Sequence, residues 1–168
     1  MSLVNSSLTH RTFLPAFQLS LRAATAAGLS VAVANLLRLE YPIYAMISAV
    51  LVTDLSSAKT RKLGLPRLAG TVLGATLGAA LGSWLPAGTW VLGGGILAGM
   101  LLSQLLGLPD VSKLTGYVCG IVLLDHGDAP WSYAGSRILE TVLGIALAVL
   151  VSFVPRLLRT EASESPTP

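Results

Sequence analysis

The sequence is poor in charged residues and in cysteine. Charged residues make up only 11% of the 168 residues, whereas hydrophobic residues make up 53%. Long uncharged runs of this kind suit a lipid bilayer better than a soluble domain, so we expect an integral membrane protein. The single cysteine, Cys119, can form neither an internal disulfide nor a cysteine-rich metal site. The net charge is +3, but most lysines and arginines of a membrane protein reflect its topology, so a nucleic-acid partner is not expected.

The sequence also lacks the short motifs that mark common catalytic sites. It contains no paired-histidine helix motif, no Gly-x-Ser-x-Gly sequence and no glycine-rich nucleotide loop ending in Lys-Ser or Lys-Thr. One histidine beside two loop carboxylates, in Asp125-His126-Gly127-Asp128, is too sparse to predict a metal site. We therefore expect no enzyme activity, no cofactor and no bound metal.

Six apolar segments are suited to the membrane, and the second and fifth of them are short. The predicted helices cover residues 13–37, 42–53, 67–85, 90–106, 112–124 and 131–154. Residues 1–12 form a polar N-terminal segment, residues 13–155 the transmembrane domain, and residues 156–168 a tail that we expect to be disordered. The expected fold is therefore an all-α membrane protein with six transmembrane helices.

Basic and aromatic residues orient these helices. If the N-terminus is cytoplasmic, the outer loops hold a single basic residue, Arg38. The inner side then collects Arg11, Lys59, Arg61, Lys62, Arg67, Lys113, Arg156 and Arg159. Amphipathic rings favour the membrane interface, and this orientation places on the outer one Tyr41, Tyr44, Trp84, Trp90, Trp131 and Tyr133. We expect both termini in the cytoplasm.

Two stretches that begin with arginine reveal an internal repeat. Arg67-Leu-Ala-Gly-Thr-Val-Leu-Gly74 returns about seventy residues later as Arg137-Ile-Leu-Glu-Thr-Val-Leu-Gly144. Each unit contains three spans, and this odd number makes the second unit enter the membrane upside down relative to the first. We predict two inverted repeats, residues 13–85 and residues 90–154.

Small residues at every fourth position form a smooth face on two of the helices, against which another backbone can pack. In the first repeat this face consists of Gly70, Gly74, Gly78 and Gly82. In the second it consists of Glu140, Gly144, Ala148 and Ser152, so a carboxylate replaces the first glycine. A glycine triplet at residues 93–95 lowers helix stability, and indicates either close packing or a broken half-helix.

An aspartate closes each short helix about a dozen residues before the arginine of the same repeat. We therefore predict two symmetry-related ion pairs, Asp54 with Arg67 near the inner face and Asp125 with Arg137 near the outer face. The alternative is that all four side chains extend separately to water along their apolar stems.

The order and spacing of these motifs resemble the aromatic acid exporter superfamily. The resemblance rests on residues 36–51, on Arg67-Leu-Ala-Gly-Thr71 with its glycine stripe, on His126-Gly-Asp128 and on Arg137 to Gly144. That superfamily includes the fusaric acid resistance (FUSC-like) proteins and is related to the plant aluminium-activated malate transporters. The resemblance implies movement of organic anions across a bacterial inner membrane. Larger members carry two such membrane units, which favours a homo-oligomer here, most simply a two-fold dimer.

Two ionisable residues within predicted spans are the main functional candidates. Arg22 lies about nine residues into its helix from the inner side, and Glu140 about as far from the outer side, which places both near the bilayer midplane. Arg22 either binds a substrate carboxylate or permanently neutralises Glu140. Glu140 either takes up and releases a proton or pairs with Arg137 on the same helix.

Three functions remain open at this stage. The first is a proton-coupled exporter of aromatic or other organic acids, in which Arg22 and Arg137 contact the anion and Glu140 carries the proton. The second is a dimeric anion channel whose pore is lined by Arg22 and Arg67. The third is a scaffold or regulatory membrane subunit whose glycine faces serve assembly alone.

Overall fold

The computed structural model describes the backbone of residues 3–125 and 129–154, and the side chains of residues 13–124 and 129–154. This part of the chain is helical throughout and contains no strand, which confirms the all-α prediction. Its elements are α1 (Leu3–Leu36), α2 (Pro42–Val52), α3 (Ser57–Trp84), α4 (Thr89–Leu105), the 3-10 turn η1 (Pro109–Val111), α5 (Ser112–Asp125) and α6 (Pro130–Ser152).

Two of the described helices have the length and apolar character needed to cross a bilayer, Phe13–Leu36 within α1 and Pro130–Ser152, which is α6. Shorter apolar helices are α2 and α4. Many large apolar side chains point away from the protein, including Trp84 and Trp90, which are almost fully exposed. Exposed apolar surface of this extent fits a chain whose solvent is lipid.

The predicted start of the third helix is wrong, and the first helix extends beyond its predicted span. The basic segment 56–67, predicted as a loop, is the first part of α3, which begins at Ser57 and continues through Pro66. The first helix begins at Leu3, ahead of its predicted span, and the predicted range 13–37 agrees with its apolar part, Phe13–Leu36. The charge of residues 56–67 favoured a loop, whereas lysine and arginine are good helix formers and extend an apolar helix into a polar region.

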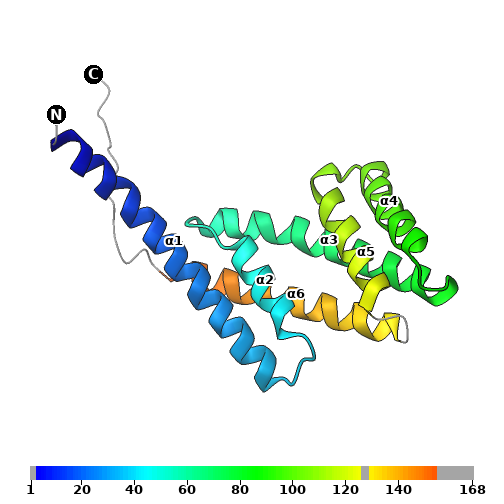
Figure 1. The fold of residues 1–168 in the computed structure, drawn as a ribbon. Helices are drawn as coiled ribbons and strands as arrows, with labels where there is room; N and C mark the ends of the chain where they lie inside the picture. Colours follow the sequence, from blue (N-terminus) through cyan, green and yellow to red (C-terminus); the bar gives the residue numbers. More distant parts are fainter. Residues whose placement is uncertain (1–2, 126–128, 155–168) are drawn as a thin grey trace.

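The two halves of the chain pack in the same way (Figure 1). If α1, α2 and α3 are exchanged with α4, α5 and α6, the same set of helix pairs is in contact. The central pair is α3 with α6. The short helix of each half packs on the long helix of the other half, α2 on α6 and α5 on α3. The first helix of each half covers the resulting pairs, since α1 contacts α2 and α6, and α4 contacts α5 and α3. The first half of α1 extends beyond the other helices (Figure 1).

Glycines allow the short and long helices to approach closely. A Cβ atom added at Gly74 would lie 2.5 Å from the carbonyl oxygen of Thr115 on α5, and one added at Gly78 would lie 2.8 Å from Cβ of Val122. The second half has the same arrangement, because Gly144 on α6 lies directly against the backbone of Ala45 on α2. Side chains at these positions would force the helix pairs apart.

The glycine triplet at residues 93–95 does not break its helix. α4 is continuous from Thr89 to Leu105, so the half-helix alternative is wrong. Gly95 is in close contact with Leu123 of α5, whereas Gly93 and Gly94 have nothing within 4 Å of an added Cβ. Close packing therefore explains one member of the triplet, and the other two lie on the open face of α4.

The core is built from small side chains. One buried cluster lies between α3, α5 and α6 and includes Ala75, Ala79 and Val122. A second lies between α1, α2 and α6 and includes Ala26 and Ala49. Small residues bring the backbones close together, so van der Waals packing replaces the hydrophobic effect, which is weak between helices in lipid.

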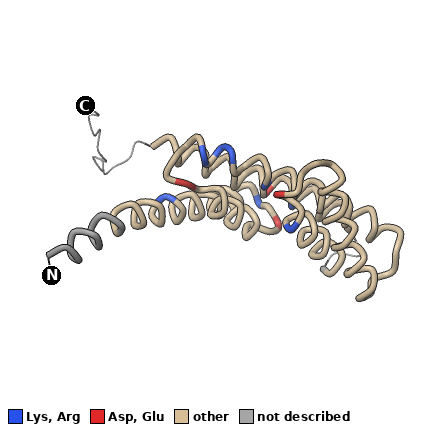
Figure 2. The backbone as a smooth tube through the Cα atoms, turned by 90° about the horizontal axis from the view of Figure 1, so that it is seen from above, with Lys and Arg blue, Asp and Glu red and all other residues tan. Residues whose placement is uncertain are grey.

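Charged residues are confined to one part of the molecule. Residues 68–109, which include α4 and most of α3, contain no lysine, arginine, aspartate or glutamate. The charges lie on the remaining part and include groups within the helix bundle (Figure 2). A buried charge is costly in a membrane protein, so these internal groups are the first place to look for function.

Candidate functional site

Glu140 is fully buried on α6 and contacts the start of α2. Its Oε1 atom accepts a 2.7 Å hydrogen bond from the backbone N–H of Tyr41, the residue that precedes α2. The first N–H groups of a helix have no partner within the helix and carry partial positive charge. Glu140 therefore supplies to α2 an N-terminal cap that comes from the other half of the chain.

Arg137, one turn before Glu140 on α6, is also buried. Its guanidinium carbon lies 3.2 Å from the centre of the Tyr44 ring, a close cation–π contact. Tyr41, Tyr44 and Tyr133 form a tyrosine cluster around it: Tyr133 meets Tyr41 edge-on with ring centres 5.0 Å apart. The hydroxyl groups of Tyr44 and Tyr133 lie 2.6 Å apart, at hydrogen-bond distance.

Arg137 and Glu140 each retain one polar atom without a partner. In the described part of the chain, Arg137 Nη1 and Glu140 Oε2 are the buried side-chain atoms that have no hydrogen bond. Among the described residues, the ion pair is that of Lys59 with Asp54. The predicted alternative, a direct pair between Arg137 and Glu140, is therefore not formed. A buried donor and a buried acceptor left open within one helical turn can receive a ligand group and a proton.

Arg22 is used to hold helix ends together. Its Nη1 atom donates to the carbonyl oxygen of Leu55 at 3.0 Å, and its Nη2 atom donates to that of Val154 at 2.7 Å. These carbonyls follow α2 and α6, where a cation interacts favourably with the helix dipole. Arg22 therefore lies at the opposite end of α2 from Glu140, and the alternative in which it neutralises Glu140 is wrong.

The predicted ion pair between Asp54 and Arg67 is not formed. Asp54 pairs instead with Lys59 at 2.9 Å and accepts a hydrogen bond from the backbone N–H of Ser56. The hydrogen bond from Lys59 lowers the pKa of Asp54 below its ordinary value of 3.8. Arg67 is out of reach because α3 begins at Ser57, which places Arg67 about 15 Å further along the helix.

Arg67 occupies in the first half the position of Arg137 in the second. It is buried on α3, donates through Nε to the hydroxyl of Ser48 at 3.3 Å, and donates through Nη1 to the hydroxyl of Tyr117. Its guanidinium carbon lies 5.8 Å from the centre of the Tyr117 ring. Each half therefore holds a buried arginine against a tyrosine that belongs to the short helix of the other half.

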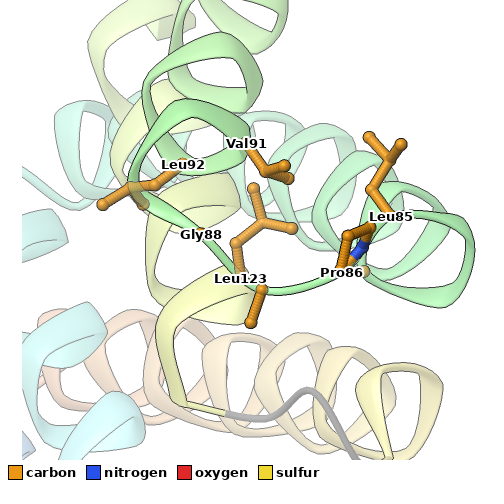
Figure 3. Close-up of a pocket in the computed structure, with 8 residues that line it drawn as sticks. Leu85, Pro86, Gly88, Val91, Leu92 and Leu123 are labelled. Atoms are coloured by element: carbon orange, nitrogen blue, oxygen red, sulfur yellow. The ribbon is translucent and has the colours of Figure 1, made fainter.

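Pockets in the described part of the chain differ in polarity. One of about 310 Å³ lies at the turn between α3 and α4, where Leu85, Pro86, Val91 and Leu123 surround it with apolar side chains (Figure 3). It contains no charged group that could fix an anion. A pocket of about 240 Å³ beside Arg22 and a groove of about 330 Å³ beside Arg67 are lined by charged side chains.

Two further predictions from the sequence concern metal binding and the Asp125–Arg137 ion pair. No group of three or more metal-ligating side chains occurs among the described residues. His126, Asp128 and the side chain of Asp125 lie outside them, and so does the predicted pair between Asp125 and Arg137.

Sequence reasoning missed the tyrosine cluster. The sequence places Tyr41, Tyr44 and Tyr133 at the outer membrane interface. In the structure Tyr133 is buried, Tyr41 and Tyr44 are half-buried, and Tyr44 lies against Arg137. Tyr41 and Tyr44 flank Pro42, the first residue of α2, and that position was the available signal.

One comparison with known proteins gives a match. The model of a family described as fusaric acid resistance protein-like matches residues 29–151. The matched range contains α2 to α5, both buried arginines of the repeat and Glu140, whereas Arg22 lies before it. Neither a curated protein nor a solved structure matches the chain.

Proposed function

Because this chain belongs to the fusaric acid resistance protein-like family, we propose that it exports aromatic or other organic acids across a bacterial inner membrane. The family supports a membrane transporter in general terms. The finer proposal, an organic-acid substrate with proton coupling, rests on one observation. Arg137 and Glu140 are buried one helical turn apart on α6, and each keeps a polar atom without a partner.

Arg137 is the anion contact in this proposal. A guanidinium stays charged in proteins and its planar fork matches a carboxylate. Nη1 is available for such a bond, and the rings of Tyr44 and Tyr133 lie beside it. The Tyr44 ring face carries the Arg137 guanidinium and Tyr133 is buried, so the anion would bind at an arginine enclosed by aromatic rings.

Glu140 is the proton site. Burial away from water disfavours its charged form, whereas the α2 N-terminus and the nearby Arg137 favour it. A carboxylate under such opposing influences can gain and lose a proton during transport. Oε1 is held by Tyr41, so Oε2 is the atom that takes the proton.

The two roles are coupled by charge. When Glu140 is ionised, it attracts Arg137 and the pair is neutral. When Glu140 is protonated, Arg137 keeps an uncompensated positive charge in a buried site, and an anion relieves it. Proton and anion therefore bind together and cross the membrane in the same direction. An acidic exterior then drives uptake of the acid, and export runs when the outward concentration gradient of the acid exceeds the inward gradient of protons.

The exchange symmetry of the helix packing supports the proposed topology. Each packing contact of the first half has a counterpart in the second, as expected for two three-helix units inserted in opposite orientations. In this arrangement both termini are cytoplasmic and the short helices α2 and α5 begin from opposite sides. A two-fold homodimer remains part of the proposal.

A flux assay in proteoliposomes tests the proposed function. The purified protein is reconstituted in vesicles, and uptake of labelled 2-naphthoate is measured with and without an acidic exterior, after subtraction of uptake by protein-free vesicles. The proposal predicts protein-dependent uptake that the acidic exterior accelerates. Current carried by the anion without a pH gradient would indicate a channel, and absence of flux would indicate a scaffold. Either result contradicts the proposed exporter.

A further inference from the structure

We propose that a groove beside Arg67 is a second anion site, which binds an amphipathic monoanion, a molecule with one acidic head group on an apolar body. The groove has a volume of about 330 Å³ and lies between α2, α3, η1 and the start of α5. It is separate from the Arg137–Glu140 site, and its occupancy does not depend on transport.

The polar side of the groove is provided by three charged groups. Arg67 is buried, and the hydrogen bonds to Ser48 and Tyr117 use two of its five N–H groups, which leaves donors for a ligand. Lys113 is exposed and adds a second positive charge. Asp110 is also exposed and lines the same groove.

These charges limit the ligand to a single negative charge. Two cations and one carboxylate give the groove a net charge of +1. A monoanion balances that charge, whereas a dianion leaves one charge in excess beside Asp110, where like charges repel. A carboxylate and a phosphodiester both satisfy this condition.

The remaining walls of the groove are apolar. Leu51 and Leu63 project from α2 and α3, and both are exposed, so their side chains are available to a ligand. The Tyr117 ring is partly exposed and carries the Arg67 guanidinium on its face. These apolar walls suit the apolar body of the ligand.

Two sources can supply this chemistry, a free organic acid or the head group of an anionic lipid. The probes are therefore 2-naphthoate and dihexanoyl-phosphatidylglycerol, each titrated calorimetrically into the full-length protein in a neutral detergent. The Arg137→Gln variant serves as the background, because it removes naphthoate binding at the other arginine.

Lys113→Gln is the primary test, since an exposed side chain can be changed without unfolding the protein. It should weaken binding of at least one probe by about tenfold, the loss expected for one charge-assisted hydrogen bond. Arg67→Gln should weaken binding of the same probe at least as much. Lys62→Gln, which removes an exposed charge outside the groove, should leave the affinity unchanged.

Asp110→Asn tests the charge limit. It should allow naphthalene-2,3-dicarboxylate, a dianion, to bind about tenfold more tightly, while monoanion binding changes less. Loss of naphthoate binding in Lys113→Gln identifies the occupant as an organic acid, and loss of lipid binding identifies it as a lipid. If Lys113→Gln alters the binding of neither probe, or Asp110→Asn leaves dianion binding unchanged, the proposal is wrong.

Discussion

Glu140 accepts a 2.7 Å hydrogen bond from the backbone N–H of Tyr41, a residue 99 positions earlier in the chain. This bond joins the two halves of the protein at the start of α2. It also gives the two carboxylate oxygens different roles. Oε1 holds the start of α2, whereas Oε2 has no hydrogen-bond partner. The stability of α2 and the proposed proton chemistry therefore depend on one side chain.

Substitutions of Glu140 should separate its role in the stability of α2 from its proposed role as the proton site. Glu140→Ala leaves the N–H of Tyr41 buried without an acceptor, which should lower the free energy of unfolding by about 1–3 kcal/mol. Glu140→Gln keeps a carbonyl oxygen at the same place and should lose much less. Thermal unfolding followed by circular dichroism in detergent measures both variants. An equal loss in the two variants would show that the cap contributes nothing.

Gly74 should tolerate no side chain. In Gly74→Ala the new Cβ lies 2.5 Å from the carbonyl oxygen of Thr115, so α3 and α5 must move apart. Overpacking of this kind typically costs about 1–3 kcal/mol, which outweighs the gain of about 1 kcal/mol from replacing glycine by alanine in a helix. Gly93→Ala is the matched control, because its Cβ meets nothing within 4 Å and the same gain should raise the unfolding temperature. A Gly74→Ala protein as stable as the parent would rule out close α3–α5 contact.

Substitution of Arg22 should lower the stability of the folded protein. Arg22→Gln loses charge-assisted hydrogen bonds to the carbonyl oxygens of Leu55 and Val154, and should lower the free energy of unfolding by at least about 1.5 kcal/mol. Lys62→Gln, a change at an exposed position of α3, should stay within about 0.5 kcal/mol of the parent. Chemical denaturation in mixed micelles compares the two variants. Unchanged stability together with lost anion binding would return Arg22 to the role of a substrate contact.

Asp54 should make stability fall at low pH. The hydrogen bond from Lys59 lowers the pKa of Asp54, so its ionised form stabilises the folded state above its ordinary value of 3.8. This contribution is lost as the pH falls below that value. Lys59 is largely exposed, so the contribution should be within about 1 kcal/mol.

Unfolding temperatures at pH 7 and pH 3 measure this effect. The decrease between the two values should be smaller in Asp54→Asn than in the parent. A decrease of the same size in both proteins would assign the pH dependence to other groups.

Hydropathy and periodicity were sufficient to find the helices and the packing role of small residues within them. The predicted range 42–53 differs from α2 by one residue, and Gly74 and Gly144 lie where helices meet. These properties are local, because a helix and its faces follow from residue spacing alone.

Contacts between different helices and loops could not be predicted in this way. The Asp54–Arg67 prediction failed because it depended on where α3 begins, and lysine-rich sequence does not mark that point. Arg22 was placed near Glu140 by counting residues, but depth along one helix does not fix its neighbours on others. The cluster of Tyr44 and Arg137 depends on α2 of one half crossing α6 of the other, which is a property of the three-dimensional packing.

The most direct measurement is the pH dependence of organic-acid flux in the Glu140→Gln variant. Parent and variant are reconstituted at equal density, and 2-naphthoate uptake is compared with acidic and with neutral exteriors, with Lys62→Gln as the control. If Glu140 carries the proton, acid should accelerate uptake by the parent and the control and should have no effect on the variant. An equal acceleration in the Glu140→Gln protein would contradict the assignment of Glu140 as the proton site.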